Sequence, residues 1–171
     1  LREVERGKRF FNTYHNHVVL YKPHGSINWK MINGKYYRIR HHDCGEPCII
    51  TPGLNKFEKG YFPPFDYHIG KMGDEIDRAL KLVFIGYGFN DNHLETHLKS
   101  AKNSSKPTLI VTKTLSQSAK NHLKCNPNAI GIEFYQDDDQ TGSQILWGNQ
   151  TRRFENIRLW AMRDLIREEL E

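Results

Sequence analysis

The sequence has few cysteines and no long hydrophobic run. Its three cysteines, Cys44, Cys48 and Cys125, are odd in number and too few for a disulfide framework, so we expect reduced thiols in a reducing compartment, the cytoplasm. No stretch approaches the roughly 20 apolar residues that a membrane-spanning helix requires. These absences argue against a disulfide-rich secreted protein and against a membrane protein, and we expect no membrane partner.

Charge of one sign is not concentrated in any part of the chain. The 25 Lys and Arg residues are scattered among 20 Asp and Glu residues, which gives a net charge of +5. A basic balance permits an anionic partner, either nucleic acid or a phosphate-bearing small molecule. Because nucleic-acid-binding proteins gather their basic residues on one face or stripe, we do not expect nucleic acid to be the partner.

The length of 171 residues fits a single domain with a core of its own.

The first part of the sequence is dominated by patterns typical of β-structure. The apolar run from Val18 to Tyr21 predicts a buried strand. Residues 26–39 alternate around Asn33–Gly34, which predicts a β-hairpin with a type I′ turn. The Pro, Gly, Asn and Lys content of 41–64 predicts a loop excursion with a possible short strand at 48–50.

The second part alternates helices with strands. Leu82–Ile85 is a continuous apolar run, as expected of a parallel strand covered on both faces. The expected elements are a helix over 72–83, strands at 82–85, 107–113 and 129–135, helices beginning near Asp91 and Leu115, and a C-terminal helix over 151–171. This alternation predicts an α/β fold with a Rossmann-like, doubly wound and mainly parallel sheet, to which the hairpin and loop excursion are added.

Two predicted strands end in residues suited to a ligand site. His24 follows the first strand, and Gly86 and Gly88 follow the strand at 82–85. In a doubly wound sheet, ligands bind at the carboxyl ends of the strands, and glycines there let backbone amides approach a phosphate or ribose. A histidine suits proton transfer near neutral pH. The residues alone leave open a hydrogen-bonded structural histidine and a tight structural turn.

The segments LYKPHGSINW and LVFIGYGFNDNHLE together resemble the SIR2-like domain of prokaryotic defence proteins, a divergent branch of the sirtuins. The resemblance spans about residues 15–135 and implies that His24 is the catalytic histidine, acting as a general base. It also implies a group of residues that contact the cofactor at the strand ends: Gly86, Tyr87, Gly88, Asn90, Asp91 and Thr112. For Asp91, a structural role as helix cap is an equally open interpretation.

The resemblance implies NAD+ as the substrate and cleavage of its bond between nicotinamide and ribose. The implied role is that of an NAD+ hydrolase effector in antiphage defence, acting as a homo-oligomer or within a larger multidomain complex. An NAD-dependent protein deacylase and a non-catalytic nucleotide-sensing or assembly module stay open as alternatives.

Two motifs of the family are not visible in this chain. They are the glycine-rich turn that holds the pyrophosphate and the asparagine motif that holds the nicotinamide ribose. We therefore expect that the N-terminal part of the domain is missing. The expected organisation is a connector or partial helix over 1–14, a partial NAD-binding domain over 15–150 and the C-terminal helix over 151–171.

A structural zinc is not expected. Sirtuin deacylases carry two Cys-x2-Cys pairs after the histidine, whereas this chain has Cys44 and Cys48 three residues apart, with His41 and His42 nearby. Cys125 is far away in the sequence. Because a second pair of closely spaced ligands is lacking, the tetrahedral set of a structural zinc site is incomplete.

Overall fold

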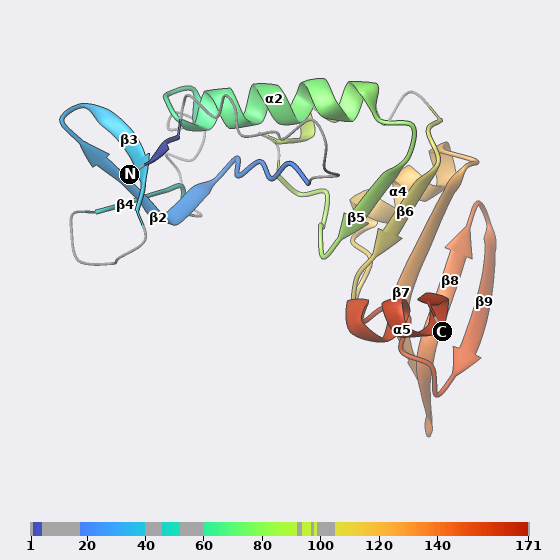
Figure 1. Ribbon diagram of the computed structural model, residues 1–171. Helices are drawn as coiled ribbons and strands as arrows, with labels where there is room; N and C mark the ends of the chain where they lie inside the picture. The colour runs from blue at the N-terminus through green and yellow to red at the C-terminus, as the bar shows by residue number, and fades with distance from the viewer. Residues whose placement is uncertain are drawn as a thin grey trace. The chain divides into compact units, whose positions relative to one another are not determined.

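The computed structural model describes residues 2–4, 18–39, 46–51, 60–91, 94–96, 98 and 105–170. The predicted connector over 1–14 and the predicted loop over 41–64 therefore fall largely outside the described residues. The chain divides into two compact units, Leu1–Glu75 and Ile76–Glu171 (Figure 1). Each unit is described by itself below.

The N-terminal unit contains an antiparallel sheet in the strand order β1-β3-β2-β4. The strands are β1 (Arg2–Glu3), β2 (Gly25–Ile32), β3 (Lys35–Arg38) and β4 (Pro47–Ile49). The predicted hairpin is confirmed, because Asn33 and Gly34 have φ values of 50° and 74° and connect β2 to β3. Positive φ at both central residues is the requirement of a type I′ turn. The short strand predicted at 48–50 is also present, as β4.

The strand predicted at Val18–Tyr21 is wrong. This segment forms no strand, and the exposed fractions of Val18, Val19 and Leu20 are 93, 43 and 70%. An apolar run is buried in a sheet only where a neighbouring strand satisfies its backbone groups. Among the described strands, none pairs with this segment.

Helix α2 (Phe65–Arg78) begins and ends earlier than the helix predicted over 72–83. Asp66 in its first turn and Arg78 in its last turn both suit the helix dipole. Phe65 and Ile69 lie one turn apart and are 7 and 3% exposed. The predicted helix began too late in the sequence because Phe65 and Ile69 are a single pair of apolar residues at helical spacing, with polar residues around them.

The C-terminal unit contains a sheet in the order β5-β6-β7-β8-β9 (Figure 1). The strands are β5 (Leu82–Ile85), β6 (Thr108–Val111), β7 (Ala129–Asp137), β8 (Gln140–Trp147) and β9 (Gln150–Glu155). The pairs β5–β6 and β6–β7 are parallel, as predicted, whereas β7–β8 and β8–β9 are antiparallel. The chain thus has a mixed α/β structure, and this sheet is mixed rather than mainly parallel.

Helix α4 (Gln117–Cys125) packs on one face of this sheet. The core at this face consists of buried residues from the sheet, the helix and the loops: Phe89, Ile110, Leu115, Ala119, Leu123 and Ala129. Phe84 of β5 packs against this core. The strand at 82–85 was predicted to be covered on both faces, but its other face is open. Val83 and Ile85 on that face are 60 and 51% exposed. Within the described sheet, β5 is an edge strand with one buried face.

The single C-terminal helix predicted over 151–171 is wrong. Residues 150–155 form β9, which pairs with β8 from Gln150↔Trp147 to Glu155↔Gly142. Helix α5 covers only Met162–Leu170. The apolar spacing that resembles a helix continues into residues 151–157, but Gly148 with φ 54° provides the turn of a hairpin. No helix in the described part of the chain is long and apolar enough to cross a membrane.

Candidate functional site

His24 lies in a tight turn between the extended segment 18–22 and β2. The Gly25 amide donates to the Lys22 carbonyl at 3.0 Å, and the Ile50 amide donates to the His24 carbonyl at 2.9 Å. Both bonds involve the peptide group that joins His24 to Gly25, so they fix the backbone that follows the histidine. Its imidazole Nε2 atom is buried. The His24 side chain is therefore held just before β2 with one ring nitrogen facing the protein interior. The prediction that it follows the carboxyl end of a strand is wrong, because residues 18–22 form no strand.

Gly25 makes this turn sterically possible. Its φ is 80°, and a Cβ atom at this position would lie 2.2 Å from the Cys48 carbonyl oxygen and 2.7 Å from Cε1 of Phe65. Both contacts are shorter than real side chains permit. The His-Gly sequence thus combines a left-handed backbone with close packing of β2 against β4 and α2.

His68 of α2 is a second histidine at this turn, and the sequence analysis missed it. Its Nδ1 accepts a hydrogen bond from the Lys22 amide at 3.4 Å, and its ring lies 4.7 Å from the Trp29 ring. Tyr21 and Tyr67 contact the same ring edge-on. Partial burial, and then the Lys22 ammonium, lower the pKa of His68 below its ordinary value. His68 is therefore neutral at neutral pH and carries its hydrogen on Nε2.

Lys22 and Ser26 flank His24 and are joined by their side chains. The Lys22 ammonium donates to the Ser26 hydroxyl at 2.7 Å. Ser26 is buried, with 9% of its surface exposed. The turn is thus bridged by a hydrogen bond from Lys22 to Ser26, and the Lys22 amide donates to the imidazole of His68.

Cys48 lies on β4 behind the turn. Burial raises the pKa of its thiol to about 11, so it is protonated at neutral pH and is a poor metal ligand or nucleophile there. His41, His42 and Cys44 lie outside the described residues, so the expectation that no zinc binds stays a prediction. Within the described ranges, no three His, Cys, Asp or Glu side chains come together in a metal-binding group.

In the C-terminal unit, the turn Gly86–Gly88 follows β5. The Gly86 amide donates to the Val111 carbonyl at 2.9 Å, and Gly86 has φ 65°. The Gly88 carbonyl accepts a hydrogen bond from the Ser116 hydroxyl. Phe89 has φ 54° and is only 3% exposed. The turn is therefore a fixed, left-handed connection that buries Phe89 and leaves the backbone at Gly86 open to approach, whereas the Asn90 side chain lies next to Gly88.

Tyr87 has a structural role in this turn. Its hydroxyl donates to Oε1 of Glu95 at 2.9 Å, and its ring stacks on Phe84 with the centroids 5.9 Å apart. Burial, followed by the hydrogen bond to Glu95, raises the pKa of Tyr87 far above its ordinary value. The phenol thus stays protonated at any physiological pH, and it can assist a ligand as a hydrogen-bonding group rather than as a base.

Asn90 and Asp91 close the turn. The Asp91 carboxylate accepts from the Leu94 amide at 3.5 Å, and the Glu95 amide donates to the Asp91 carbonyl at 2.8 Å. This is the pattern of a helix N-cap, as one of the two interpretations of Asp91 requires. Asn90 is exposed, and its side-chain oxygen lies 3.5 Å from the Ser118 hydroxyl.

Thr112 begins the loop that follows β6. Its amide donates to the Ile132 carbonyl at 3.1 Å, which extends the sheet by one bond. The loop ends at Ser116, whose hydroxyl accepts from the Ala119 amide at 3.0 Å and caps α4. Since Ser116 also bonds to Gly88, the loops after β5 and β6 are tied together at the carboxyl ends of these parallel strands.

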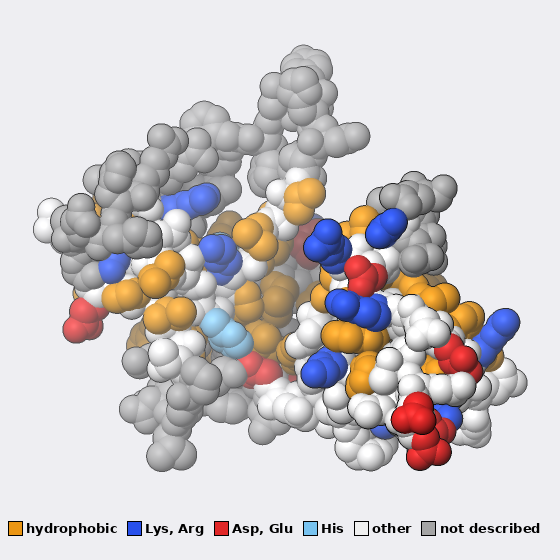
Figure 2. Space-filling view, turned by 90° about the horizontal axis from the view of Figure 1, so that it is seen from below, with side chains coloured by type: hydrophobic (Ala, Val, Ile, Leu, Met, Phe, Trp, Pro, Cys, Tyr) orange, Lys and Arg blue, Asp and Glu red, His pale blue; other side chains and the backbone are white. Residues whose placement is uncertain are grey.

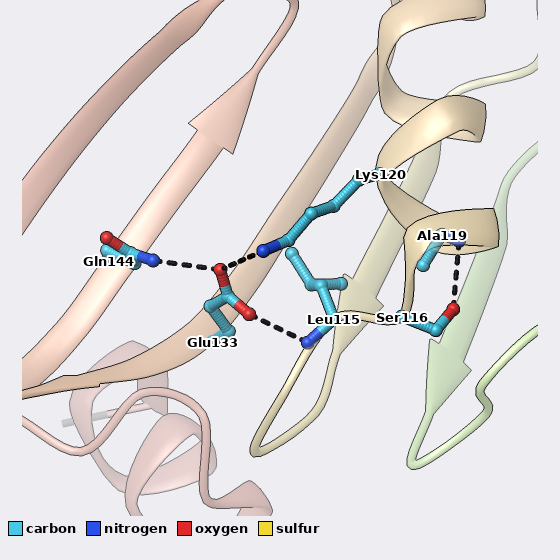
Figure 3. Close-up of polar contacts among 6 residues, drawn as sticks. All are labelled: Leu115, Ser116, Ala119, Lys120, Glu133 and Gln144. Atoms are coloured by element: carbon cyan, nitrogen blue, oxygen red, sulfur yellow. Dashed lines mark hydrogen bonds and ion pairs between the residues drawn. The ribbon is translucent and has the colours of Figure 1, made fainter.

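A buried carboxylate supports this arrangement (Figure 3). Glu133 of β7 is 3% exposed, and its Oε2 accepts from the Leu115 amide at 2.7 Å. Its Oε1 accepts from Gln144 at 2.8 Å and lies 3.4 Å from the Lys120 ammonium. A buried charge is tolerated only with such partners. Glu133 thus anchors the loop after β6, and the sequence analysis did not identify it.

The six predicted cofactor-contacting residues, from Gly86 to Thr112, all belong to the C-terminal unit, whereas His24 belongs to the N-terminal unit. Within the C-terminal unit, hydrogen bonds connect the turn after β5 with the loop after β6. On the face drawn in Figure 2, Lys and Arg side chains are dispersed among acidic and hydrophobic ones.

Comparison with known proteins gives one match. A family model described as "SIR2-like domain" matches residues 4–124, which is more than half of the 171 residues. The matched range includes His24, the Gly86–Gly88 turn and Thr112. Neither the curated proteins nor the solved structures give a match to this chain.

Proposed function

The chain belongs to the SIR2-like domain family, and from this premise we propose that it hydrolyses NAD+ at the bond between nicotinamide and ribose. Membership of the family points to an NAD-related function and is compatible with an NAD-utilising enzyme. The single observation that carries the finer proposal is the His24 turn. The peptide that joins His24 to Gly25 is held by two backbone hydrogen bonds, and the residues two before and two after the histidine, Lys22 and Ser26, are joined by their side chains.

His24 acts as the general base in this proposal. It takes a proton from a ribose hydroxyl or from the attacking water while the bond from ribose C1′ to the nicotinamide nitrogen breaks. Nicotinamide leaves with the bonding electron pair, and water adds to C1′ to give ADP-ribose. The transition state resembles an oxocarbenium ion, so catalysis depends on electrostatic stabilisation and on holding the ribose in place. A positioned general base contributes roughly 10² to 10⁴ in rate.

The cofactor-contacting residues have a supporting role in this proposal. Gly86 and Gly88 let the ribose and phosphate region of NAD+ approach the backbone, and Tyr87, Asn90 and Asp91 border the same region. Thr112 lies at the end of the next parallel strand, where an adenosine would bind in a Rossmann-like arrangement. The positive φ of Gly86 and the tie between Gly88 and Ser116 support a preformed turn at this place.

The biological role proposed here is defence against bacteriophage in the cytoplasm, in which depletion of NAD+ halts the host. The domain would act within a homo-oligomer or a larger multidomain complex. This part of the proposal rests on the resemblance of LYKPHGSINW and LVFIGYGFNDNHLE to defence proteins.

Nicotinamide release tests the proposed reaction. A protein that contains the complete domain is incubated with NAD+, and nicotinamide and ADP-ribose are quantified by chromatography. We expect release from the wild-type chain, loss of release in His24→Ala, and wild-type release in Lys35→Ala, a change at an exposed position of the same hairpin. Equal release from His24→Ala and the wild type would contradict the role of His24.

The same assay separates the alternatives. A deacylase releases nicotinamide only when an acyl-lysine peptide is added and gives acyl-ADP-ribose instead of ADP-ribose. A sensing module binds NAD+, as measured by calorimetry, without releasing nicotinamide. Either result would replace hydrolysis as the function.

A further inference from the structure

Lys22 is a half-buried cation without a carboxylate partner in the described part of the chain. Its ammonium donates to the neutral Ser26 hydroxyl at 2.7 Å, and the side chain is only partly exposed. Among the described residues, no Asp or Glu lies within ion-pair distance of it. A charge that loses part of its hydration without gaining a counter-charge raises the free energy of the folded chain. The arrangement is therefore costly unless an anion binds there.

The charged side chain that acts on His68 is a cation. The Lys22 ammonium disfavours protonation of His68, and no carboxylate opposes this effect at His68. The acidic side chains near this end of α2, Asp74 and Glu75, act on Tyr21 instead. The region next to His24 thus combines a positive charge with hydrogen-bond donors.

We propose that Lys22, Ser26 and His68 form a subsite for a phosphoryl group beside His24. The identification of that group as part of the NAD+ pyrophosphate rests on the proposed function. A lysine is a compact point charge and a common phosphate ligand. The Ser26 hydroxyl orients the ammonium by accepting one of its hydrogens and can donate its own hydrogen to a phosphoryl oxygen.

His68 supplies a further donor. Its Nδ1 accepts from the Lys22 amide, so the neutral ring carries a hydrogen on Nε2. This Nε2 atom is buried and has no hydrogen-bond acceptor among the described residues. Buried polar atoms without a partner are uncommon and call for an explanation, and a phosphoryl oxygen is an acceptor of the required kind.

The chemistry of NAD+ agrees with this placement. The pyrophosphate is attached to the 5′ carbon of the ribose that carries nicotinamide. A protein that places a base at the reacting end of this ribose therefore needs an anion ligand close by. Lys22 precedes His24 by two residues, and Ser26 follows it by two.

Ligand binding to the full chain tests the subsite. Lys22→Met keeps the length of the apolar stem and removes the charge; Lys35→Met is the matched control at an exposed position of the hairpin. Affinities for NAD+, inorganic pyrophosphate and nicotinamide riboside, which has no phosphate, are measured by calorimetry. We expect Lys22→Met to weaken NAD+ and pyrophosphate about tenfold or more, the magnitude typical of a hydrogen bond to a charged group, and to leave nicotinamide riboside unchanged. Lys35→Met should bind all three like the wild type.

Lys22→Arg and NMR keep the test decisive if Lys22→Met does not fold. The arginine variant retains the charge and should restore most of the pyrophosphate binding. In the wild type, added pyrophosphate should shift the imidazole resonances of His68. Unchanged pyrophosphate affinity in a folded Lys22→Met variant, or no pyrophosphate binding by the wild type, overturns the subsite. Pyrophosphate binding that depends on Lys22 without any NAD+ binding overturns the proposed function instead and leaves the subsite intact.

Discussion

The Ser116 hydroxyl donates a hydrogen bond to the Gly88 carbonyl and at the same time accepts one from the Ala119 amide. One side chain therefore caps α4 and fixes the peptide that follows the second glycine of the turn after β5. In a trans peptide, the C=O and N–H groups point in opposite directions. Ser116 thus determines the direction of the Phe89 amide as well.

Substitutions at Ser116 should separate these two roles. Ser116→Ala removes both bonds and should lower the free energy of unfolding by about 1 to 2 kcal/mol. Ser116→Asp retains an acceptor for the cap but has no hydrogen to give to Gly88, so it should be more stable than Ser116→Ala and still shift the Phe89 amide resonance. Ser116→Thr should behave like the wild type, and Lys124→Ala, at an exposed position of α4, serves as control. Urea denaturation and amide NMR provide the measurements. An unshifted Phe89 amide in Ser116→Asp would contradict the coupling.

The backbone at the two glycines of the β2–β3 hairpin predicts different tolerances to substitution. Gly25 and Gly34 have similar φ values, 80° and 74°, but only Gly25 has atoms within 4 Å of an added Cβ. Gly34→Ala should cost about 1 kcal/mol for the left-handed backbone. Gly25→Ala should cost about 1 to 3 kcal/mol more, because the methyl group clashes with Cys48 and Phe65. Urea denaturation of both variants tests this, and equal losses would refute the close packing at Gly25.

The buried Glu133 should tolerate neutralisation poorly. Glu133→Gln removes a charge that Lys120 and the Leu115 amide satisfy, and it places an NH2 group against one of these donors. We expect a loss of about 2 to 3 kcal/mol in the free energy of unfolding. Asp137→Asn, which breaks the exposed ion pair with Arg153, should lose no more than about 1 kcal/mol. Similar losses for the two variants would show that the Glu133 network contributes little.

His68 should make the stability depend on pH in a defined direction. Its pKa in the folded chain is below the ordinary value because of burial and the Lys22 ammonium, so the unfolded chain binds the proton more readily. The stabilisation is present above about pH 6.5, the unfolded value, and is lost as the pH falls below it toward the folded pKa. Tyr21, Lys22 and Tyr67 contact the ring. His68→Gln should flatten this part of the stability profile measured by urea denaturation between pH 5 and 8. A profile identical to that of the wild type would refute the assignment.

Local signals account for what the sequence predicted well. Asn33–Gly34 determines the hairpin because few other residues adopt positive φ in succession, and the apolar runs of β5, β6 and β7 are long enough to exclude loops. In these segments the backbone preference and the tertiary structure agree.

Long-range pairing accounts for what the sequence did not predict. Residues 151–155 match a helical period by chance, and only their pairing with β8 makes them a strand. His68 was missed because its role comes from contact with Lys22 and Trp29, which are distant in the sequence. Glu133 looked like an ordinary polar residue in a strand, and its partners come from α4, β8 and the loop before α4.

The exposed run Val18–Leu20 has a practical consequence for the behaviour of the chain in solution. It is uncharged, rich in β-branched residues and open to other molecules, and such segments pair with copies of themselves. Val18→Lys should therefore raise the concentration at which the protein stays monodisperse in light scattering, with unchanged unfolding by urea. If the wild type and Val18→Lys aggregate at the same concentration, a surface other than Val18–Leu20 mediates the self-association. The Val18→Lys variant is therefore a suitable background for crystallisation and binding assays. In this background, self-association should not obscure the effect of a substitution near His24.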